Sequence, residues 1–416
     1  MDLPIGFKEM IGRLLGDDAP RLLEALQSEP VTSVRINTRK PGAIFPGSKP
    51  VPWCPTGFYL PSRPVFTLDP LLHAGAYYVQ DASSMIYREV IRRIATTPAT
   101  LLDMCAAPGG KTTAMIDALP DGSRVVANEY VARRAAILKE NLAKWGYPLA
   151  VVTNRDSAFF ANSADRFDIV AVDAPCSGEG MMRKDEDAVR QWSPQLVSDC
   201  AALQKTILSN AAEVVKPGGY LIYSTCTFNR EENEEVAEFI RSSLGLEPVD
   251  LNFPAEWGIP RGIDTDLPVY RFMPHVTEGE GLFLAVFRRP GSEAFSNPLL
   301  SSIPERRKVE RKSPKPAKGA KKSAAPSRKG MREPQEEIPE IEEILSLDFD
   351  RSRFPEAEVD LPTALSYLRR ESITLSPDIP KGYVVVTYKG LPLGLAKNIG
   401  SRANNLYPKG WRILMQ

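Results

Sequence analysis

The stretch LLDMCAAPGGKTTAMIDAL, residues 101–119, contains the pattern that decides the fold. A short apolar run at 101–104 reads as a buried strand, a loop with two glycines follows, and a helix-like segment begins at Lys111. A strand followed by a short glycine loop and a helix is the first half of a β-α-β unit. The stretch therefore predicts an α/β fold with a parallel sheet.

The chain on the carboxyl side of this unit continues the same alternation. Helices are predicted at 132–145 and 194–215, where apolar residues recur at helical spacing. Strands are predicted at 124–130, 149–154, 167–173 and 218–225, and a further strand at 281–289 could close the sheet in the antiparallel direction. Strands of nearly continuous apolar character separated by helices indicate a parallel sheet buried on both faces.

The segments outside this core differ from it in composition and in predicted secondary structure. Residues 1–75 are rich in proline and turn residues after a strand-like stretch, so we expect a small N-terminal α+β domain, followed by the main domain at 76–290. Residues 338–416 hold one helix pattern and one alternating strand, which predicts a compact mixed domain.

Between the last two domains we expect a disordered basic linker at 291–337. From Arg306 to Arg332 it has twelve basic residues and one acidic residue, Glu310, and few large apolar side chains that could offset the entropy of ordering. Two interpretations stay open and are compatible: a solubilising spacer, or weak electrostatic attachment to RNA phosphates.

Composition excludes several classes of protein. The chain has 52 Lys and Arg against 52 Asp and Glu, so net charge says nothing about a partner. Five cysteines, no CxxC pair and two histidines argue against a disulfide framework and a structural zinc site, and we expect no metal. No apolar run is long enough to span a membrane, and the N-terminal stretch does not resemble a secretory signal. A cytoplasmic protein is expected.

Ligands bind open α/β sheets at the carboxyl ends of the strands, and polar loops follow three of the predicted strands. The loop from Cys105 to Lys111 lacks the G-x-G-x-x-G spacing of a dinucleotide cradle, but its paired glycines allow a ligand to approach the backbone closely. Glu129, at the end of the next strand, suits a carboxylate that holds ribose hydroxyls. A nucleoside cofactor is favoured over a tight structural turn with a surface glutamate.

Two cysteines follow two other strands. Cys176 lies three residues after Asp173, and Cys226 lies two residues after Ser224. In a parallel sheet both thiols would reach the same edge, beside the aspartate. Redox switching and metal binding are the alternatives for such a pair, but neither explains the aspartate or the nucleoside-type loop.

These residues stand in motifs that resemble a known family. CAAPGGKT, DAPCSGEGMMRKD and STCTFNREENEE are similar to the cofactor and catalytic motifs of the Sun/Nop family of RNA cytosine-5 methyltransferases. VQDASSM at 79–85 and the stretch 274–289 fit the same family, so the resemblance runs from about Val31 to Arg289. The tail LGLAKNIGSRANNLYPKGWRI resembles the PUA-like RNA-binding region of the bacterial YebU-type subgroup, which modifies 16S ribosomal RNA.

The resemblance implies a Rossmann-like methyltransferase domain that binds S-adenosylmethionine, with a PUA-like C-terminal domain. It also implies which residues line the cofactor pocket: Cys105, Ala106, Ala107, Pro108, Gly109, Gly110, Lys111, Glu129, Asp156 and Asp173. From the residues alone, Asp156 would be interpreted as an N-terminal helix or turn residue.

Carbon 5 of cytosine is a poor nucleophile until a thiolate adds to carbon 6, which splits one difficult step into easier ones. Negative charge then develops on the ring, and a protonated Asp173 is placed to donate to N3. Residue patterns alone do not choose between the cysteines, and by analogy with the Pro-Cys motif of DNA cytosine methyltransferases the nucleophile would be Cys176. The resemblance implies Cys226 as the nucleophile and Cys176 as an aid to product release.

The expected partner is RNA, most directly 16S ribosomal RNA within the small subunit, bound by a monomer. The alternatives are the same chemistry on transfer RNA, or a catalytically inactive RNA-binding assembly factor. A nicotinamide oxidoreductase is opposed by the missing phosphate fingerprint. Tyr77, Tyr78, Trp192 and Arg183 could stack on bases or hold phosphate, but we interpret them as core or ordinary surface.

Overall fold

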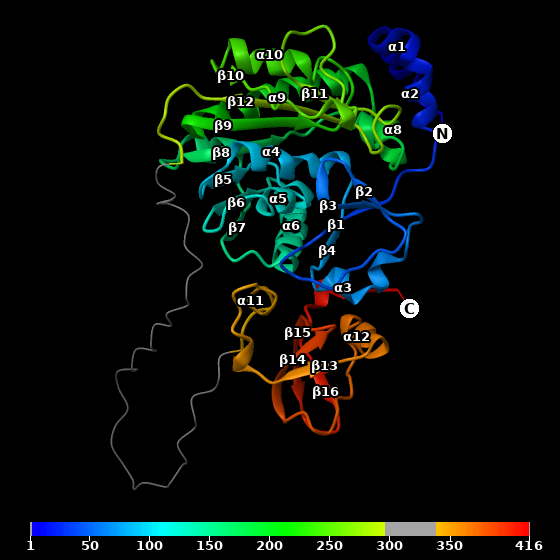
Figure 1. Cartoon of the computed structure of the whole chain (residues 1–416), viewed down its shortest axis with the longest axis vertical. Helices are drawn as coiled ribbons and strands as arrows, with labels where there is room; N and C mark the ends of the chain where they lie inside the picture. Colours follow the sequence, from blue (N-terminus) through cyan, green and yellow to red (C-terminus); the bar gives the residue numbers. More distant parts are fainter. Residues whose placement is uncertain (1, 296–337, 416) are drawn as a thin grey trace, which may run out of the picture.

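A computed structural model describes residues 2–295 and 338–415 (Figure 1). Its central sheet has eight strands in the order β10-β12-β9-β8-β5-β6-β7, with β11 paired to β12. The bounds are β5 (Thr100–Asp103), β6 (Arg124–Asn128), β7 (Ala150–Thr153), β8 (Phe167–Asp173), β9 (Val215–Thr225), β10 (Glu247–Pro248), β11 (Tyr270–Phe272) and β12 (Leu282–Arg288). Strands β5 to β9 are parallel and β12 is antiparallel to β9, which confirms the predicted fold class.

Helices cover both faces of this sheet because successive residues of a strand point to opposite sides. Leu101 packs with helices on one face, and its neighbour Leu102 packs with helices on the other. The first face holds α4 (Ile86–Ile94), α5 (Gly110–Ile116) and α6 (Ala132–Trp145); the second holds α7 (Ser157–Ala161), α9 (Pro194–Val214) and α10 (Glu234–Ser242). Among the described residues no helix has the length and apolarity of a bilayer-spanning segment.

The N-terminal part supplies two separate pieces. Its four-stranded sheet has the order β2-β3-β1-β4, with β1 (Ser33–Ile36), β2 (Lys49–Val51), β3 (Cys54–Tyr59) and β4 (Tyr77–Val79). Helices α1 (Ile5–Leu15) and α2 (Ala19–Ala25) lie away from that sheet, beside α8 (Glu186–Gln191) of the central part (Figure 1). There the ring of Phe7 meets that of Trp192 edge to face at 5.6 Å.

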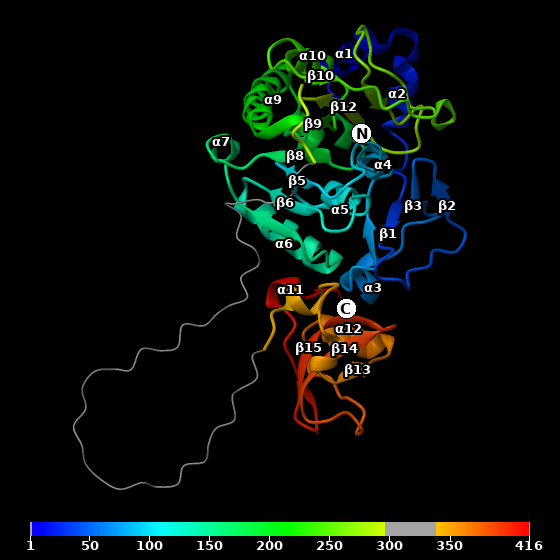
Figure 2. The ribbon, with the colours of Figure 1, turned by 60° about the vertical axis from the view of Figure 1, so that its left-hand side comes forward.

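The C-terminal part, in the residues that the structure describes, is a second four-stranded sheet with two helices against it. It contains α11 (Ile341–Ile344), β13 (Glu356–Glu358), α12 (Leu361–Leu368), β14 (Gly382–Tyr388), β15 (Leu391–Asn398) and β16 (Ala403–Asn405). Figures 1 and 2 show it next to α6 and α3 (Pro70–His73). Most of the predicted linker, from residue 296 onward, lies outside the described residues.

Candidate active site

The carboxyl ends of β5, β6, β8 and β9 form the rim of two cavities that share side chains. The larger cavity has a volume of about 770 Å³ and the smaller about 370 Å³. The predicted residues on the larger cavity are Cys105, Glu129, Asp156, Asp173, Cys176 and Cys226. Four residues line both cavities, namely Cys105, Arg134, Asp173 and Cys226. The two cysteines and the aspartate therefore meet at one edge of the sheet.

The larger cavity contains a buried carboxylate oxygen that receives no hydrogen bond. Glu129 is 3% exposed, and its Oε1 accepts a hydrogen bond from the backbone N–H of Val131 at 2.9 Å. Its Oε2 has no hydrogen-bond donor, although Nη1 of Arg134 lies 3.2 Å away. A buried acceptor without a donor is costly, and a ribose hydroxyl would supply the donor. The cavity thus fits the nucleoside part of S-adenosylmethionine.

Asp156 lies on the same cavity and has a second role. Its Oδ1 accepts the backbone N–H of Ala158 at 2.8 Å, so it is the N-cap of α7. The interpretation made from the residue pattern alone is therefore correct as local structure. The cap leaves the side chain on the cavity wall, where a ligand can also reach it.

The loop after β5 divides between the two cavities. Of its predicted residues, Cys105 is the one on the larger cavity, while Ala106, Ala107, Pro108, Gly110 and Lys111 line the smaller one. Gly109 is on neither lining, but its φ of +109° just before α5 is a conformation that favours glycine. The sulfur of Cys105 is buried beside acidic groups, and burial raises the pKa of this thiol, so it is not a ready nucleophile.

The thiols of Cys176 and Cys226 are in contact, with their sulfur atoms 3.2 Å apart. A hydrogen bond from Cys176 lowers the pKa of Cys226; burial and the negative charge of Asp173 oppose this shift, while the charge of Lys111 assists it. The same hydrogen bond, together with burial, raises the pKa of Cys176. The contact allows either sulfur to donate, and the two pKa directions favour Cys226 as the thiolate and Cys176 as the donor.

Asp173 is oriented by two donors that both reach Oδ1. The hydroxyl of Ser224 donates at 2.6 Å, and the ammonium group of Lys111 forms an ion pair with the same oxygen. Burial opposes the charge on Lys111, but the attraction of Asp173 outweighs it and raises the lysine pKa. Tyr87 bonds to the Ser224 hydroxyl at 2.7 Å. Within the described ranges no hydrogen bond falls on Oδ2 of Asp173, which leaves it for a ligand.

Sequence reasoning missed parts of this arrangement. Lys111, predicted to line the cofactor pocket, also forms an ion pair with Asp173, which was not predicted. Ser224 stands inside a quoted motif, so its place at the strand end could have suggested its contact with Asp173. Tyr87 is 137 residues away from Ser224 and comes from α4, and no spacing in the sequence indicates that contact.

Two buried glutamates tie the loops that carry the cysteines. Oε2 of Glu232 accepts the backbone N–H of Ser177 at 3.0 Å, next to Cys176. Oε2 of Glu179 accepts the backbone N–H groups of Phe228 and Asn229, at 2.7 and 2.9 Å, shortly after Cys226. Each loop is thus held by a carboxylate from the other. Their mutual position fixes the distance between the sulfur atoms.

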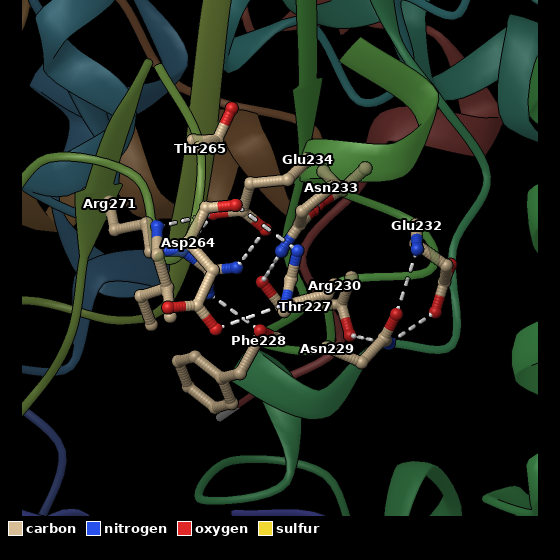
Figure 3. A network of polar contacts seen from close by, with 12 residues as sticks. Thr227, Phe228, Asn229, Arg230, Glu232, Asn233, Glu234, Asp264, Thr265 and Arg271 are labelled. Carbon is tan, nitrogen blue, oxygen red and sulfur yellow. Dashed lines mark hydrogen bonds and ion pairs between the residues drawn. The ribbon is translucent and has the colours of Figure 1, made fainter. Parts of the chain in front are cut away.

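The segment after Cys226 is further anchored by a network shown in Figure 3. Arg271 of β11 forms a buried ion pair with Glu234 and donates from Nη1 to the carbonyl oxygen of Phe228 at 2.6 Å. Asn233 donates to the carbonyl oxygen of Thr227 at 3.0 Å. These contacts hold the backbone that follows the nucleophile candidate.

The four residues considered for base or phosphate contact have structural partners. Trp192 donates from Nε1 to Glu179 at 2.9 Å, and Arg183 forms a buried ion pair with Glu280. Tyr77 donates to Asp69, and Tyr78 donates to the carbonyl oxygen of Pro108 at 3.2 Å. Only Tyr78 is also on the lining of the smaller cavity.

Three family models match successive parts of the chain. Residues 3–82 match the N-terminal domain of 16S rRNA methyltransferase RsmF. Residues 95–288 match the model described as 16S rRNA methyltransferase RsmB/F. Residues 354–413 match the methyltransferase RsmF PUA domain, which agrees with the predicted PUA-like unit.

Similar whole proteins and structures agree with these matches. Ribosomal RNA small subunit methyltransferase F of Erwinia tasmaniensis is 30% identical, over 98% of this chain and 96% of its own length. The protein of the same name from Photobacterium profundum is 34% identical over 69% of this chain and 64% of its own. A methyltransferase homologue from Pyrococcus horikoshii has a TM-score of 0.58 at 28% identity, covering 68% of this chain and 94% of its own. NSun6 from the same organism, crystallised with SFG, shares the fold at 20% identity, with a TM-score of 0.60 over 70% of this chain and 99% of its own.

Proposed function

The chain belongs to the ribosomal RNA small subunit methyltransferase F family, and on this premise we propose that it methylates carbon 5 of a cytosine in 16S ribosomal RNA. The observation that carries the proposal is the contact at 3.2 Å between Cys176 and Cys226, on the wall of a cavity that also holds Asp173. A thiolate beside an acid is what covalent activation of a pyrimidine requires, and the second thiol is placed to assist release. A catalytically inactive assembly factor would not need them.

S-adenosylmethionine supplies the methyl group, attached to a positively charged sulfur. Glu129 is assigned to the ribose hydroxyls, since its Oε2 is buried and lacks a hydrogen-bond donor. The remaining proposed cofactor contacts are Asp156, Asp173 and the loop from Cys105 to Lys111. Within that loop, the contact with the larger cavity rests on Cys105.

Cys226 acts first as the nucleophile. Its thiolate adds to carbon 6 of the cytosine, and the electron pair of the C5–C6 double bond moves into the ring toward N3 and O2. Asp173 is assigned to N3: its Oδ1 stays paired with Lys111, and its Oδ2 would take up a proton when the base binds and donate it to N3 as charge develops. Lys111, paired with Asp173, keeps a positive charge beside that developing negative charge. Carbon 5 is then nucleophilic and takes up the methyl group, while the bond between that group and the cofactor sulfur would break and leave its electron pair on the sulfur, giving S-adenosylhomocysteine.

Release reverses the addition. A base removes the proton from carbon 5, the double bond forms again, and the S–C6 bond breaks with its electron pair returning to Cys226. Cys176 assists because its S–H group, 3.2 Å from the departing sulfur, donates to the thiolate as it forms. This division of roles agrees with the opposite directions of the two thiol pKa values.

The proposal includes the organisation of the whole protein. We propose units at 1–75, 76–290, 291–337 and 338–416, with the PUA domain contacting RNA outside the active site. We further propose that the protein acts as a monomer on the small ribosomal subunit, in the cytoplasm, where bacterial ribosomal RNA is found. Transfer RNA is the alternative substrate for the same chemistry.

RNA that carries 5-fluorocytidine at the target position tests the covalent step. Fluorine blocks the proton removal from carbon 5, so the enzyme should remain bound to the RNA as an adduct visible on a denaturing gel. Replacing Cys226 with alanine should abolish the adduct. Replacing Cys176 with alanine should retain it, because this thiol acts after addition.

Cys200→Ala is the matched control, since this cysteine is buried in α9 and lies on neither cavity lining. It should form the adduct as the unmodified protein does. Adduct formation by Cys226→Ala but not by Cys176→Ala would exchange the roles of the two thiols. No adduct from the unmodified protein on 16S or transfer RNA would refute the proposed chemistry.

A further inference from the structure

The smaller cavity contains a buried amide nitrogen without a partner. Gln80 follows β4, is 7% exposed, and lines this cavity together with Lys111, Asp173 and Cys226. Among the described residues, no acceptor forms a hydrogen bond with its Nε2. Burying an N–H group without an acceptor is unfavourable, so an acceptor supplied by a ligand would be stabilising.

The orientation of the Gln80 amide is determined by Arg35. The Nε–H group of Arg35 donates to Oε1 of Gln80 at 2.8 Å. An arginine nitrogen only donates, so the oxygen of the amide must face it and the nitrogen must point the other way. Arg35 is itself completely buried, paired with Asp117 and bonded to Thr113 at 2.5 Å. The donor on Gln80 is therefore held in place before any ligand arrives.

Other donors on the smaller cavity are already engaged. Lys111 is paired with Asp173. Arg134 lies against Glu129 and donates to the carbonyl oxygen of Ala107 at 2.9 Å. Of these three side chains, Gln80 is the uncharged one, and its Nε2 is a buried nitrogen with no hydrogen-bond partner among the described residues.

The positions of the reacting atoms on the cytosine ring indicate which atom of the base the N–H group of Gln80 meets. Carbon 5 must face the larger cavity, where the methyl donor is proposed to bind, while carbon 6 meets Cys226 between the two cavities. Carbon 2 lies opposite carbon 5 across the six-membered ring, so its oxygen points away from the larger cavity. Gln80 lines the smaller cavity and not the larger one.

We propose that Nε2 of Gln80 donates a hydrogen bond to O2 of the target cytosine, making Gln80 a further catalytic residue; this rests on the proposed function. When the Cys226 sulfur bonds to carbon 6, the displaced electron pair is shared between N3 and O2. A donor fixed at O2 is therefore worth more in the transition state than in the ground state. Asp173 at N3 and Gln80 at O2 then divide the charge between them.

Two near-isosteric variants test this assignment in single-turnover methyl transfer. Gln80→Met removes the donor and the acceptor for Arg35, whereas Gln80→Glu keeps that acceptor, replaces the donor by a second acceptor oxygen and adds a negative charge. Both should lower the rate of the chemical step about 10²-fold, the usual loss of one oxyanion donor, with RNA affinity changed much less. Binding of S-adenosylmethionine and the melting temperature of Gln80→Glu should match those of the unmodified protein.

RNA with 2-thiocytidine at the target gives an independent readout, since sulfur accepts hydrogen bonds weakly. The unmodified protein should be slowed at least about tenfold on this RNA, whereas Gln80→Met should react with both RNAs at similar rates. Gln195→Met is the matched control, because Gln195 is exposed at the start of α9 and bonds only to Asp199.

The outcomes separate the two proposals. If the unmodified protein forms no adduct with 5-fluorocytidine RNA, the proposed function is wrong. If it forms the adduct and both Gln80 variants transfer methyl within about threefold of its rate, Gln80 has no part in the chemistry. Equal slowing of all proteins by the 2-thio group would also overturn the contact with O2.

Discussion

Buried polar atoms without partners are informative at the scale of single residues. Eight buried side-chain nitrogen and oxygen atoms lack a hydrogen bond within residues 2–295 and 338–415, among them Oε2 of Glu129 and Nε2 of Gln80. These two belong to residues on the cavity linings and are of opposite kind, one an acceptor and the other a donor. The first suits a ribose hydroxyl and the second a pyrimidine carbonyl.

Asp103 makes stability depend on pH. It lies at the end of β5, 2% exposed, and burial raises its pKa to about 7, although the hydrogen bond from Thr112 opposes the shift. Between about pH 4 and 7 the unfolded chain ionises at this carboxyl group while the folded protein keeps its proton, so stability is lost as pH rises through this window. Above pH 7 the contribution no longer changes.

Replacing Asp103 with asparagine should remove this dependence, because an amide oxygen can still accept from Thr112 and does not ionise. Relative to the unmodified protein, the variant should gain up to about 4 kcal/mol in the free energy of unfolding between pH 4 and 8. Urea unfolding at several pH values measures the difference. A constant difference across this range would show that Asp103 does not titrate there.

At the scale of elements, ion pairs tie β11 and the loops around it to the segment after Cys226. Arg271 of β11 and Glu234 at the start of α10 are both about 2% exposed in their side chains. Arg230 and Asp264 form a similar pair nearby, but their side chains are 38% and 76% exposed. Water screens the exposed pair, whereas the buried pair has no substitute for a lost partner.

We therefore expect very different results from the same substitution at the two arginines. Arg271→Leu leaves Glu234 buried without its counter-ion and should cost about 3–5 kcal/mol in the free energy of unfolding. Arg230→Leu should cost less than about 1 kcal/mol. Chemical denaturation of both variants measures these losses. Similar losses of unfolding free energy would mean that burial does not determine how much each ion pair contributes to stability.

At the scale of the whole molecule, Lys40 joins three parts of the chain. Its buried ammonium group donates to the carbonyl oxygens of Ala74, Lys144 and Leu345, at 3.1, 2.6 and 2.7 Å. These residues follow α3, lie near the end of α6, and follow α11 of the C-terminal part. This side chain thus helps to fix the C-terminal part against the rest, together with contacts such as the ion pair of Lys139 and Glu342.

Lys40→Met should loosen this junction, since three buried carbonyl oxygens lose their donor at about 1–3 kcal/mol for each unsatisfied group. Amide hydrogen exchange in β14 and β15 should become faster than in the central sheet. Lys139→Met is the control, because Lys139 also reaches the C-terminal part, through Glu342, but its side chain is 63% exposed. If amide hydrogen exchange in β14 and β15 were unchanged in Lys40→Met, contacts other than those of Lys40 would hold the C-terminal part in place.

Much of the architecture could be predicted from the sequence. Apolar runs and helical periodicity located β5 to β9 and β12, because they report which residues are buried locally. The short strands β10 and β11 were not predicted, since two or three residues carry no period. The start of β9 at Val215 was also missed, since Pro217, Gly218 and Gly219, which usually mark a turn, lie inside this strand.

The sequence by itself determined that two thiols and an acid would stand at one edge of a parallel sheet, because strand direction brings the carboxyl ends together. Only the tertiary structure decided that the two thiols are in contact, that Lys111 pairs with Asp173, and that Gln80, on the lining of the smaller cavity, has a buried amide nitrogen without an acceptor among the described residues. These depend on contacts between residues far apart in the chain. A local pattern reports burial, but it does not report which buried atom lies opposite.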